Sequence, residues 1–303
     1  MIILAIETTG PKASVALINE NGDITEKTSD EEVNHLRGLV PMIKELIDEY
    51  GCAVSDIRYV AASVGPGSFT GIRIGVATAR ALAQAWTVQT ISVPTLESFV
   101  YNIDGNNAVT QGNSETTQRN NVITQRNNVI TQGHSETTQS NNVITQRSNY
   151  DKNGIKLICP IFDARRSQIY SGAYYLDNGK PRTLLPGAAW EFELFFETLT
   201  GLLKEQDGKY KEIVFFGDGL CVFEENIHRW TQSLDPRIET ATAAREDRYQ
   251  KASSVARMAY VLMNEGACGH YSGLLPVYMR KAEAERRREA LGESSGISGN
   301  GKA

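Results

Sequence analysis

Residues 63–83 read SVGPGSFTGIRIGVATARALA, and this stretch decides how the rest of the chain is interpreted. A short apolar run ends in the glycine-rich turn GPGSFTG, which opens a segment with helical spacing. One face of the predicted helix lacks side-chain bulk, because a small residue recurs every four positions: Gly71, Gly75, Ala79 and Ala83. Such a face allows close packing on the chain's own sheet or on a second subunit, and the spacing favours neither.

The segments before this turn predict a strand-rich first half. IILAIETT and ASVALINENG are predicted strands, and Asn21-Gly22 indicates a hairpin into a third strand, ITEKTSD. A helix is predicted over HLRGLVPMIKELIDEYG, with a kink or a start near Pro41. The strand RYVAASVG precedes the glycine-rich turn, and the strand TISV closes this half.

The second half repeats this order. KLICPIFDARRSQIYSGAYYLDNGKPRTL predicts paired strands with a hairpin at Asn178-Gly179, and the helix FELFFETLTGLLKEQ and the strand EIVFFGDG follow. Further helices are predicted from Glu224 to Trp230 and over SSVARMAYVLMNEG. We therefore expect an α/β protein of two similar halves, each a mixed sheet flanked by helices. This order is similar to that of the actin, Hsp70 and sugar-kinase (ASKHA) superfamily.

A repeat tract separates the halves. NNAVTQGNSETTQRNNVITQR begins at Asn106, and a second copy of this unit begins at Asn127. Its polar composition predicts a disordered or weakly ordered insertion, with a small β-solenoid as the alternative. The predicted organisation is an N-terminal half, a repeat insertion, a C-terminal half and a flexible tail, at residues 1–103, 104–152, 153–285 and 286–303.

Composition excludes several classes of protein. The net charge is −5 over 303 residues, so we expect no unaided grip on an RNA backbone. The four cysteines form no C-x-x-C pair, and no two of the four histidines are spaced as a helical metal pair. The start MIILAIETTG lacks the features of a secretory signal, and no apolar run approaches the ~20 residues of a membrane span. We expect a cytoplasmic protein.

Two segments stand where an ASKHA enzyme carries its phosphate loops. In IETTG, Glu7 could hold a cation before small residues that face a phosphate, or it could simply cap a strand turn. In FDARRSQIY, long cationic side chains follow Asp163 where a phosphate loop needs small residues, which counts against a phosphotransferase. The arginines could contact an anion or a partner's carboxylate, or they could be solvated. The candidate anion or nucleotide contacts are Thr8, Thr9, Gly67, Ser68, Arg73 and Arg165.

The motifs AIETT, HLRGLVPMIKEL, SVGPGSFTGIRIGVATARALA, FDARRSQIY, FFGDG and LLPVYMRK together resemble the TsaB family. The resemblance covers nearly the whole chain except the repeat tract and the tail. It implies an ASKHA fold that is not an enzyme by itself and holds no metal. It further implies a scaffold subunit that binds and stabilises the catalytic paralogue TsaD, with the ATPase TsaE, to form threonylcarbamoyladenosine beside the tRNA anticodon.

The resemblance also implies the partner surface. It places the contact with TsaD, or with a second copy when the chain is alone, on two helices of the first half. The residues that match this face are Leu39, Met42, Ile43, Gly71, Ile72, Gly75 and Ala79. No cofactor of the chain's own is implied; any ATP or ADP is expected at the interface with TsaD and TsaE, and tRNA contacts the chain only through the complex.

Two departures and two alternatives accompany this interpretation. Glu7 stands where many relatives carry Asp, and the repeat tract is foreign to the family. The first alternative is an ASKHA-type ATP-dependent small-molecule kinase, which predicts a glycine-rich second phosphate loop. The second is a protease-like activity, which would need a metal pair or a nucleophile with its base.

Overall fold

The computed structural model describes residues 1–29, 35–102, 109–111, 155–245 and 247–280. The repeat insertion predicted at 104–152 lies outside the described residues apart from 109–111, and the predicted tail at 286–303 lies outside them entirely. Among the described helices, none combines the length and the apolar character needed to cross a bilayer.

The first half is built on a five-stranded sheet in the order β3-β2-β1-β4-β5. The β1, β2 and β3 strands pair antiparallel, whereas β4 runs parallel to β1 and β5 parallel to β4. The predicted hairpin is confirmed at Gly22, whose φ is 84° and whose N–H donates to the Asn19 carbonyl at 3.1 Å. The strands are β1 (Ile2–Glu7), β2 (Ser14–Asn19), β3 (Ile24–Thr28), β4 (Ile57–Gly65) and β5 (Gln89–Pro94).

The second sheet repeats the order and directions of the first, as β9-β8-β7-β10-β11, and β6 adds antiparallel to β11. Asn178 and Gly179 have φ of 52° and 75°, the two left-handed residues that a tight hairpin requires. The predicted duplication is therefore confirmed. The strands are β6 (Val109–Gln111), β7 (Ile155–Asp163), β8 (Gln168–Asp177), β9 (Lys180–Glu191), β10 (Tyr210–Phe216) and β11 (Glu239–Ala243).

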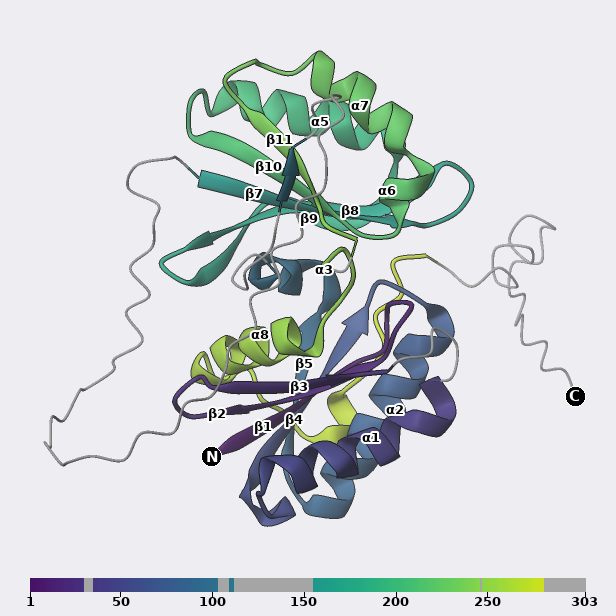
Figure 1. The fold of residues 1–303 in the computed structure, drawn as a ribbon, viewed down its shortest axis with the longest axis vertical. Coiled ribbons are helices and arrows are strands. Elements are labelled where there is room, and N and C mark those ends of the chain that lie inside the picture. Colours follow the sequence, from purple (N-terminus) through teal and green to yellow (C-terminus); the bar gives the residue numbers. More distant parts are fainter. Residues whose placement is uncertain (30–34, 103–108, 112–154, 246, 281–303) are drawn as a thin grey trace, which may run out of the picture.

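Helices lie outside and between the two sheets (Figure 1). On the outer face of the first sheet lie α1 (His35–Tyr50) and α2 (Phe69–Trp86). On the outer face of the second lie α5 (Phe192–Glu205), α6 (Gly219–Val222) and α7 (Glu224–Gln232). Between the sheets lie α3 (Thr95–Ser98) and α8 (Ala252–Asn264).

Alternation along β1 explains why the first strand is apolar throughout. Leu4 and Ile6 face α1 and α2, whereas Ile3 and Ala5 face the core between the sheets. Both faces of the strand are therefore buried, so a continuous apolar run replaces the alternation of a half-exposed strand.

The end of the chain returns to the first half. The helix α8 follows the second sheet in sequence, yet it packs on β1 and β2, and its Ala252 N–H donates to Ser14 Oγ at 2.8 Å. Residues 271–280, here called the C-terminal strap, then run along α2, where the Val277 N–H donates to the Val64 carbonyl at 2.8 Å. The two halves are thus tied together by a segment that belongs to the second half in sequence.

Candidate functional site

Glu7, at the end of β1, is fully buried and bonded through both carboxylate oxygens. Thr9 Oγ1 donates to Glu7 Oε1 at 2.6 Å, and Ser63 Oγ donates to Oε2. Burial raises the pKa of Glu7, and the donors from Ser63 and Thr9 counteract part of this rise. The protein's own donors therefore occupy the carboxylate that the sequence placed in the first loop.

The glycine-rich turn packs directly on the loop after β1. The Ser68 N–H donates to the Thr9 carbonyl at 2.8 Å, and Thr8 Oγ1 donates to the Gly71 carbonyl at 2.7 Å. A Cβ at Gly71 would lie 1.9 Å from the Thr8 carbonyl oxygen, and one at Gly67 would lie 2.6 Å from the Thr9 carbonyl oxygen. Glycine is therefore required at both positions. The structure thus brings four of the candidate anion contacts together, namely Thr8, Thr9, Gly67 and Ser68. Their polar groups and backbones bond to or pack on one another.

A side chain from the far end of the chain fills the space beside Gly10. A Cβ at Gly10 would lie 2.5 Å from Gln250 Oε1. In a phosphate loop, the anion approaches the backbone through the space that glycine leaves open. Here the Gln250 amide occupies that space, so a phosphate group could reach the backbone only if this side chain moved away.

The second loop, after β7, is a tight left-handed turn. Arg165, Arg166 and Ser167 have φ of 64°, 57° and 58°, a conformation that costs ~1–2 kcal/mol for each non-glycine residue. Asp163 fixes the turn, because its Oδ1 accepts from the Arg165 N–H at 2.7 Å. The Arg165 side chain is 85% exposed and pairs with Asp163 at 3.1 Å. This candidate anion contact therefore lies on the surface of a strained turn.

Asp218, after β10, is a part of this region to which sequence reasoning gave no role. Its Oδ1 accepts from the Asp163 N–H at 3.2 Å, and burial raises its pKa. Asp218 belongs to the segment FFGDG, which the sequence analysis used only as one of the motifs that resemble the TsaB family. Across the described residues, no group of three or more His, Cys, Asp or Glu side chains is placed to hold a metal ion.

The chain is similar to proteins that are named for the formation of threonylcarbamoyladenosine on tRNA. Residues 28–112 match the family model of TsaD, tRNA N6-adenosine threonylcarbamoyltransferase. The tRNA threonylcarbamoyladenosine biosynthesis protein TsaB of Bacillus subtilis is 26% identical over 290 residues, which are 95% of this chain and 97% of that protein. TsaB of Escherichia coli is 34% identical over 111 residues, which are 37% of this chain and 48% of that protein.

The solved structure of YeaZ from Pseudomonas aeruginosa has the same fold, with a TM-score of 0.58 and 20% identity over 91% of this chain and 99% of that one. A second solved structure, of a protein described as similar to peptidase YeaZ from Pseudomonas aeruginosa, has a TM-score of 0.61 and 21% identity over 92% of this chain and 99% of that one. These likenesses show the fold, and the match to TsaB of Bacillus subtilis runs along both halves of the chain. The chain is a TsaB homologue.

In this TsaB homologue, the residues predicted to meet a partner are core residues of the chain itself. The stripe of α2 packs on the first sheet, where a Cβ at Gly75 would lie 2.3 Å from Thr8 Oγ1. Contact between these residues and a partner stays a prediction. Because they are buried in this structure, other side chains form the surface that α1 and α2 present to a partner. The buried residues are Leu39, Met42, Ile43, Gly71, Ile72, Gly75 and Ala79.

A second stripe of small residues lies on the outer side of α2. Ala77, Ala81 and Ala85 recur every four residues and are exposed. On α1, Val40 is 56% exposed and Pro41 is also exposed. We call these five residues the outer helix face of the TsaB homologue. Sequence reasoning missed it, although the alanines of ATARALAQA carry the same spacing as the buried stripe.

Arg73, at the beginning of α2, is committed to two aromatic rings. Its Cζ lies 3.8 Å from the centroid of the Phe69 ring, and its Nε donates to the Tyr278 hydroxyl at 2.8 Å. Phe69 and Tyr278 are 44% and 41% exposed, and their rings lie 5.0 Å apart. This candidate anion contact therefore joins α2 to the C-terminal strap. Tyr278, from the motif LLPVYMRK, was not predicted to take part.

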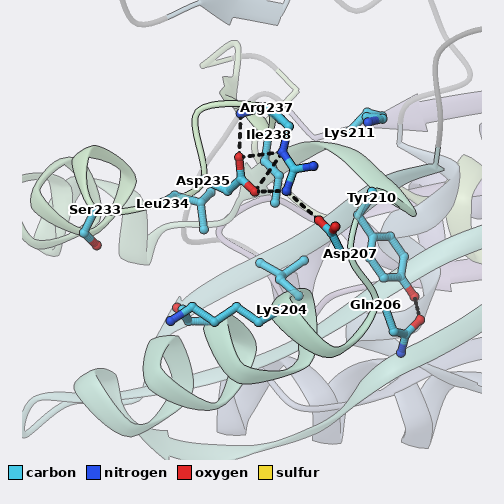
Figure 2. A pocket seen from close by; sticks show the side chains of 13 residues that line it. Lys204, Gln206, Asp207, Tyr210, Lys211, Ser233, Leu234, Asp235, Arg237 and Ile238 are labelled. Carbon is cyan, nitrogen blue, oxygen red and sulfur yellow. Dashed lines mark hydrogen bonds and ion pairs between the residues drawn. The ribbon is translucent and has the colours of Figure 1, made fainter.

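The TsaB homologue also has a pocket of about 160 Å³ where α5 ends and β10 begins (Figure 2). Arg237 Nη2 lies 2.6 Å from Asp235 Oδ2 and 2.5 Å from Asp207 Oδ1. This pairing lowers the pKa of Asp235 to about 2. Two carboxylates thus neutralise the guanidinium, which clamps the turn after α7 and offers no free charge to a ligand.

Proposed function

We propose that this chain is a non-catalytic subunit in the formation of threonylcarbamoyladenosine on tRNA. It would act by binding a TsaD-like catalytic subunit through the outer helix face. The observation that carries this proposal is the exposed stripe of Ala77, Ala81 and Ala85, on a helix whose opposite face is already packed. The proposed process, threonylcarbamoyladenosine formation, rests on the TsaB relatives, which are named as tRNA threonylcarbamoyladenosine biosynthesis proteins.

The filled first loop supports the non-catalytic part of the proposal. Gln250 fills the space beside Gly10, and Glu7 is bonded by Thr9 and Ser63. A kinase needs both places open to the phosphates of its nucleotide and to their cation. The kinase alternative therefore gains no support from the described residues. Any ATP or ADP would sit at the interface with the TsaD-like subunit and a TsaE-like ATPase.

The outer helix face supports the binding part. Small residues every four positions let a second helix approach to the ~8–10 Å that is typical of packed helices. Val40 and the alanines would then lose apolar surface to the partner, which stabilises association. In the absence of a TsaD-like subunit, the same face of a second copy would serve, giving a homodimer. The net charge of −5 disfavours direct contact with the negatively charged tRNA backbone, so other subunits would make most of that contact. The complex would act in the cytoplasm.

Light scattering after size-exclusion chromatography tests the proposal, with this chain and its cognate TsaD-like subunit alone and mixed. Ala81→Arg places a long charged side chain on the outer helix face without entering the core, because Ala81 is exposed. We expect the wild type to form a heterodimer that Ala81→Arg abolishes. Ala267→Arg, at an exposed alanine after α8, is the matched control and should bind normally. A heterodimer that survives Ala81→Arg would refute the assigned face.

A further inference from the structure

A cavity of about 220 Å³ lies between α7 and β11, on the outer face of the second sheet. Ala241 and Ala243 face the core between the sheets, so Thr240 and Thr242 point to the opposite face by alternation. The lining residues are Phe215, Leu220, Glu224, Ile227, His228, Thr231, Thr240, Ala241, Thr242 and Arg248.

Arg248 is a half-buried cation in the wall of this cavity. Its Nε donates to the Ala243 carbonyl at 3.2 Å, and its Nη1 lies 3.4 Å from Cys221 Sγ. Among the residues that the structure describes, no carboxylate lies within ion-pair distance of this guanidinium. Arg237, in the pocket of Figure 2, has two such carboxylates. A half-buried guanidinium that forms no ion pair with a described carboxylate favours an anionic ligand group.

Glu224 places the opposite charge in the same cavity. It lies in the first turn of α7, and no cation of the described ranges pairs with it. The hydroxyls of Thr240 and Thr242 likewise have no hydrogen-bond partner within the described chain. Between these polar groups, Phe215, Leu220 and Ile227 supply an apolar floor. The cavity therefore offers one cationic group, one anionic group and an apolar surface.

We propose that this cavity binds a free α-amino acid with an apolar side chain. The ligand carboxylate would pair with Arg248, and its ammonium group would donate to Glu224 and a threonine hydroxyl. The side chain would pack on the apolar floor. The cavity is smaller than the ~300–1,000 Å³ of sites for drug-sized ligands, which suits a single amino acid. This site lies on the second half and does not depend on the proposed function of the outer helix face.

Calorimetric titration of the full chain with three probes tests each part of the proposal. L-Leucine carries both charges, 4-methylpentanoate lacks the amine, and L-leucinamide lacks the carboxylate. We expect L-leucine to bind saturably and most tightly. Arg248→Gln should weaken L-leucine and 4-methylpentanoate by about tenfold or more and leave L-leucinamide unchanged. Glu224→Gln should weaken L-leucine and L-leucinamide and leave 4-methylpentanoate unchanged.

Thr242→Leu keeps the test decisive if Arg248→Gln loosens the turn that its Nε holds. It fills the cavity without changing a charge, so we expect it to weaken all three probes. Arg237→Gln, in the other pocket, is the control and should leave binding unchanged. The proposal is overturned if L-leucine does not bind saturably to the folded chain, or if neither Arg248→Gln nor Thr242→Leu weakens its binding.

Discussion

Glu7, Thr9 and Ser63 form a closed group at the end of β1, and Gln250 completes it beside Gly10. At the scale of single residues, the first loop thus keeps the polar side chains of a phosphate site but turns them toward one another. Each donor that bonds Glu7 is a donor withheld from a ligand. The residues of the loop therefore stabilise the fold and position the glycine-rich turn.

The buried carboxyl of Glu7 predicts a pH effect on stability. Burial raises its folded-state pKa above the ordinary value of 4.5, so protonation favours the folded chain. That contribution is present below the unfolded-state pKa and is lost as the pH rises through the folded-state pKa. Glu7→Gln removes the titration and keeps the shape, so we expect its melting temperature relative to wild type to be higher at about pH 8 than at about pH 5.

Circular dichroism of thermal unfolding measures both proteins at the two pH values. An equal difference in melting temperature at both pH values would contradict the raised pKa of Glu7.

The sequence placed Glu7, Thr8 and Thr9 in one loop but could not show that the Gln250 side chain fills the space beside this loop. That contact joins opposite ends of the chain, and no local spacing records it.

At the scale of elements, α2 carries small residues on two faces. Gly71 and Gly75 pack on the loop and strand of the first half, whereas Ala77 and Ala81 are exposed. The inner face fixes the helix to its sheet, and the outer face is exposed, as the proposed binding of a partner requires. For this reason a bulky residue at Gly75 would test folding, not assembly.

Gly71→Ala is expected to destabilise the chain by about 2 kcal/mol or more, because its Cβ would meet the Thr8 backbone and the core is already filled. Gly201→Ala, in α5, is the matched control. Nothing lies within 4 Å of a Cβ at Gly201, so alanine there should stabilise the helix by about 0.5–1 kcal/mol. Urea unfolding measures both variants. Equal effects of the two substitutions would show that the contact at Gly71 is not tight.

The elements themselves were largely predictable from hydrophobic period and turn residues. Both hairpin turns and the main helices lie where the sequence placed them. Pro41, however, neither starts nor ends α1, which runs through it with Pro41 on the exposed side. The spacing of residues in α2 predicted a stripe of small residues but not whether that stripe faces the chain's own sheet or a partner. Helical spacing alone does not show which neighbour a face contacts.

At the scale of the whole molecule, the second half closes on the first. The helix α8 packs on β1 and β2, and the C-terminal strap reaches α2 and the second loop, where Arg280 donates to the Ala164 carbonyl. The duplicated order of strands was visible in the sequence. The packing of α8 on the first sheet was not visible, because the apolar face of a helix could pack on either sheet and its spacing does not say which.

The central claim is that this chain acts through its outer helix face and not through chemistry in its own loops. The most direct test is the initial rate of tRNA threonylcarbamoylation in a reconstituted system with TsaD-like and TsaE-like subunits. Asp163→Asn alters the carboxylate of the second loop while keeping its shape, and Ala81→Arg alters the outer helix face. We predict that Asp163→Asn keeps the rate and that Ala81→Arg abolishes it. Loss of activity with Asp163→Asn and full activity with Ala81→Arg would contradict the scaffold role.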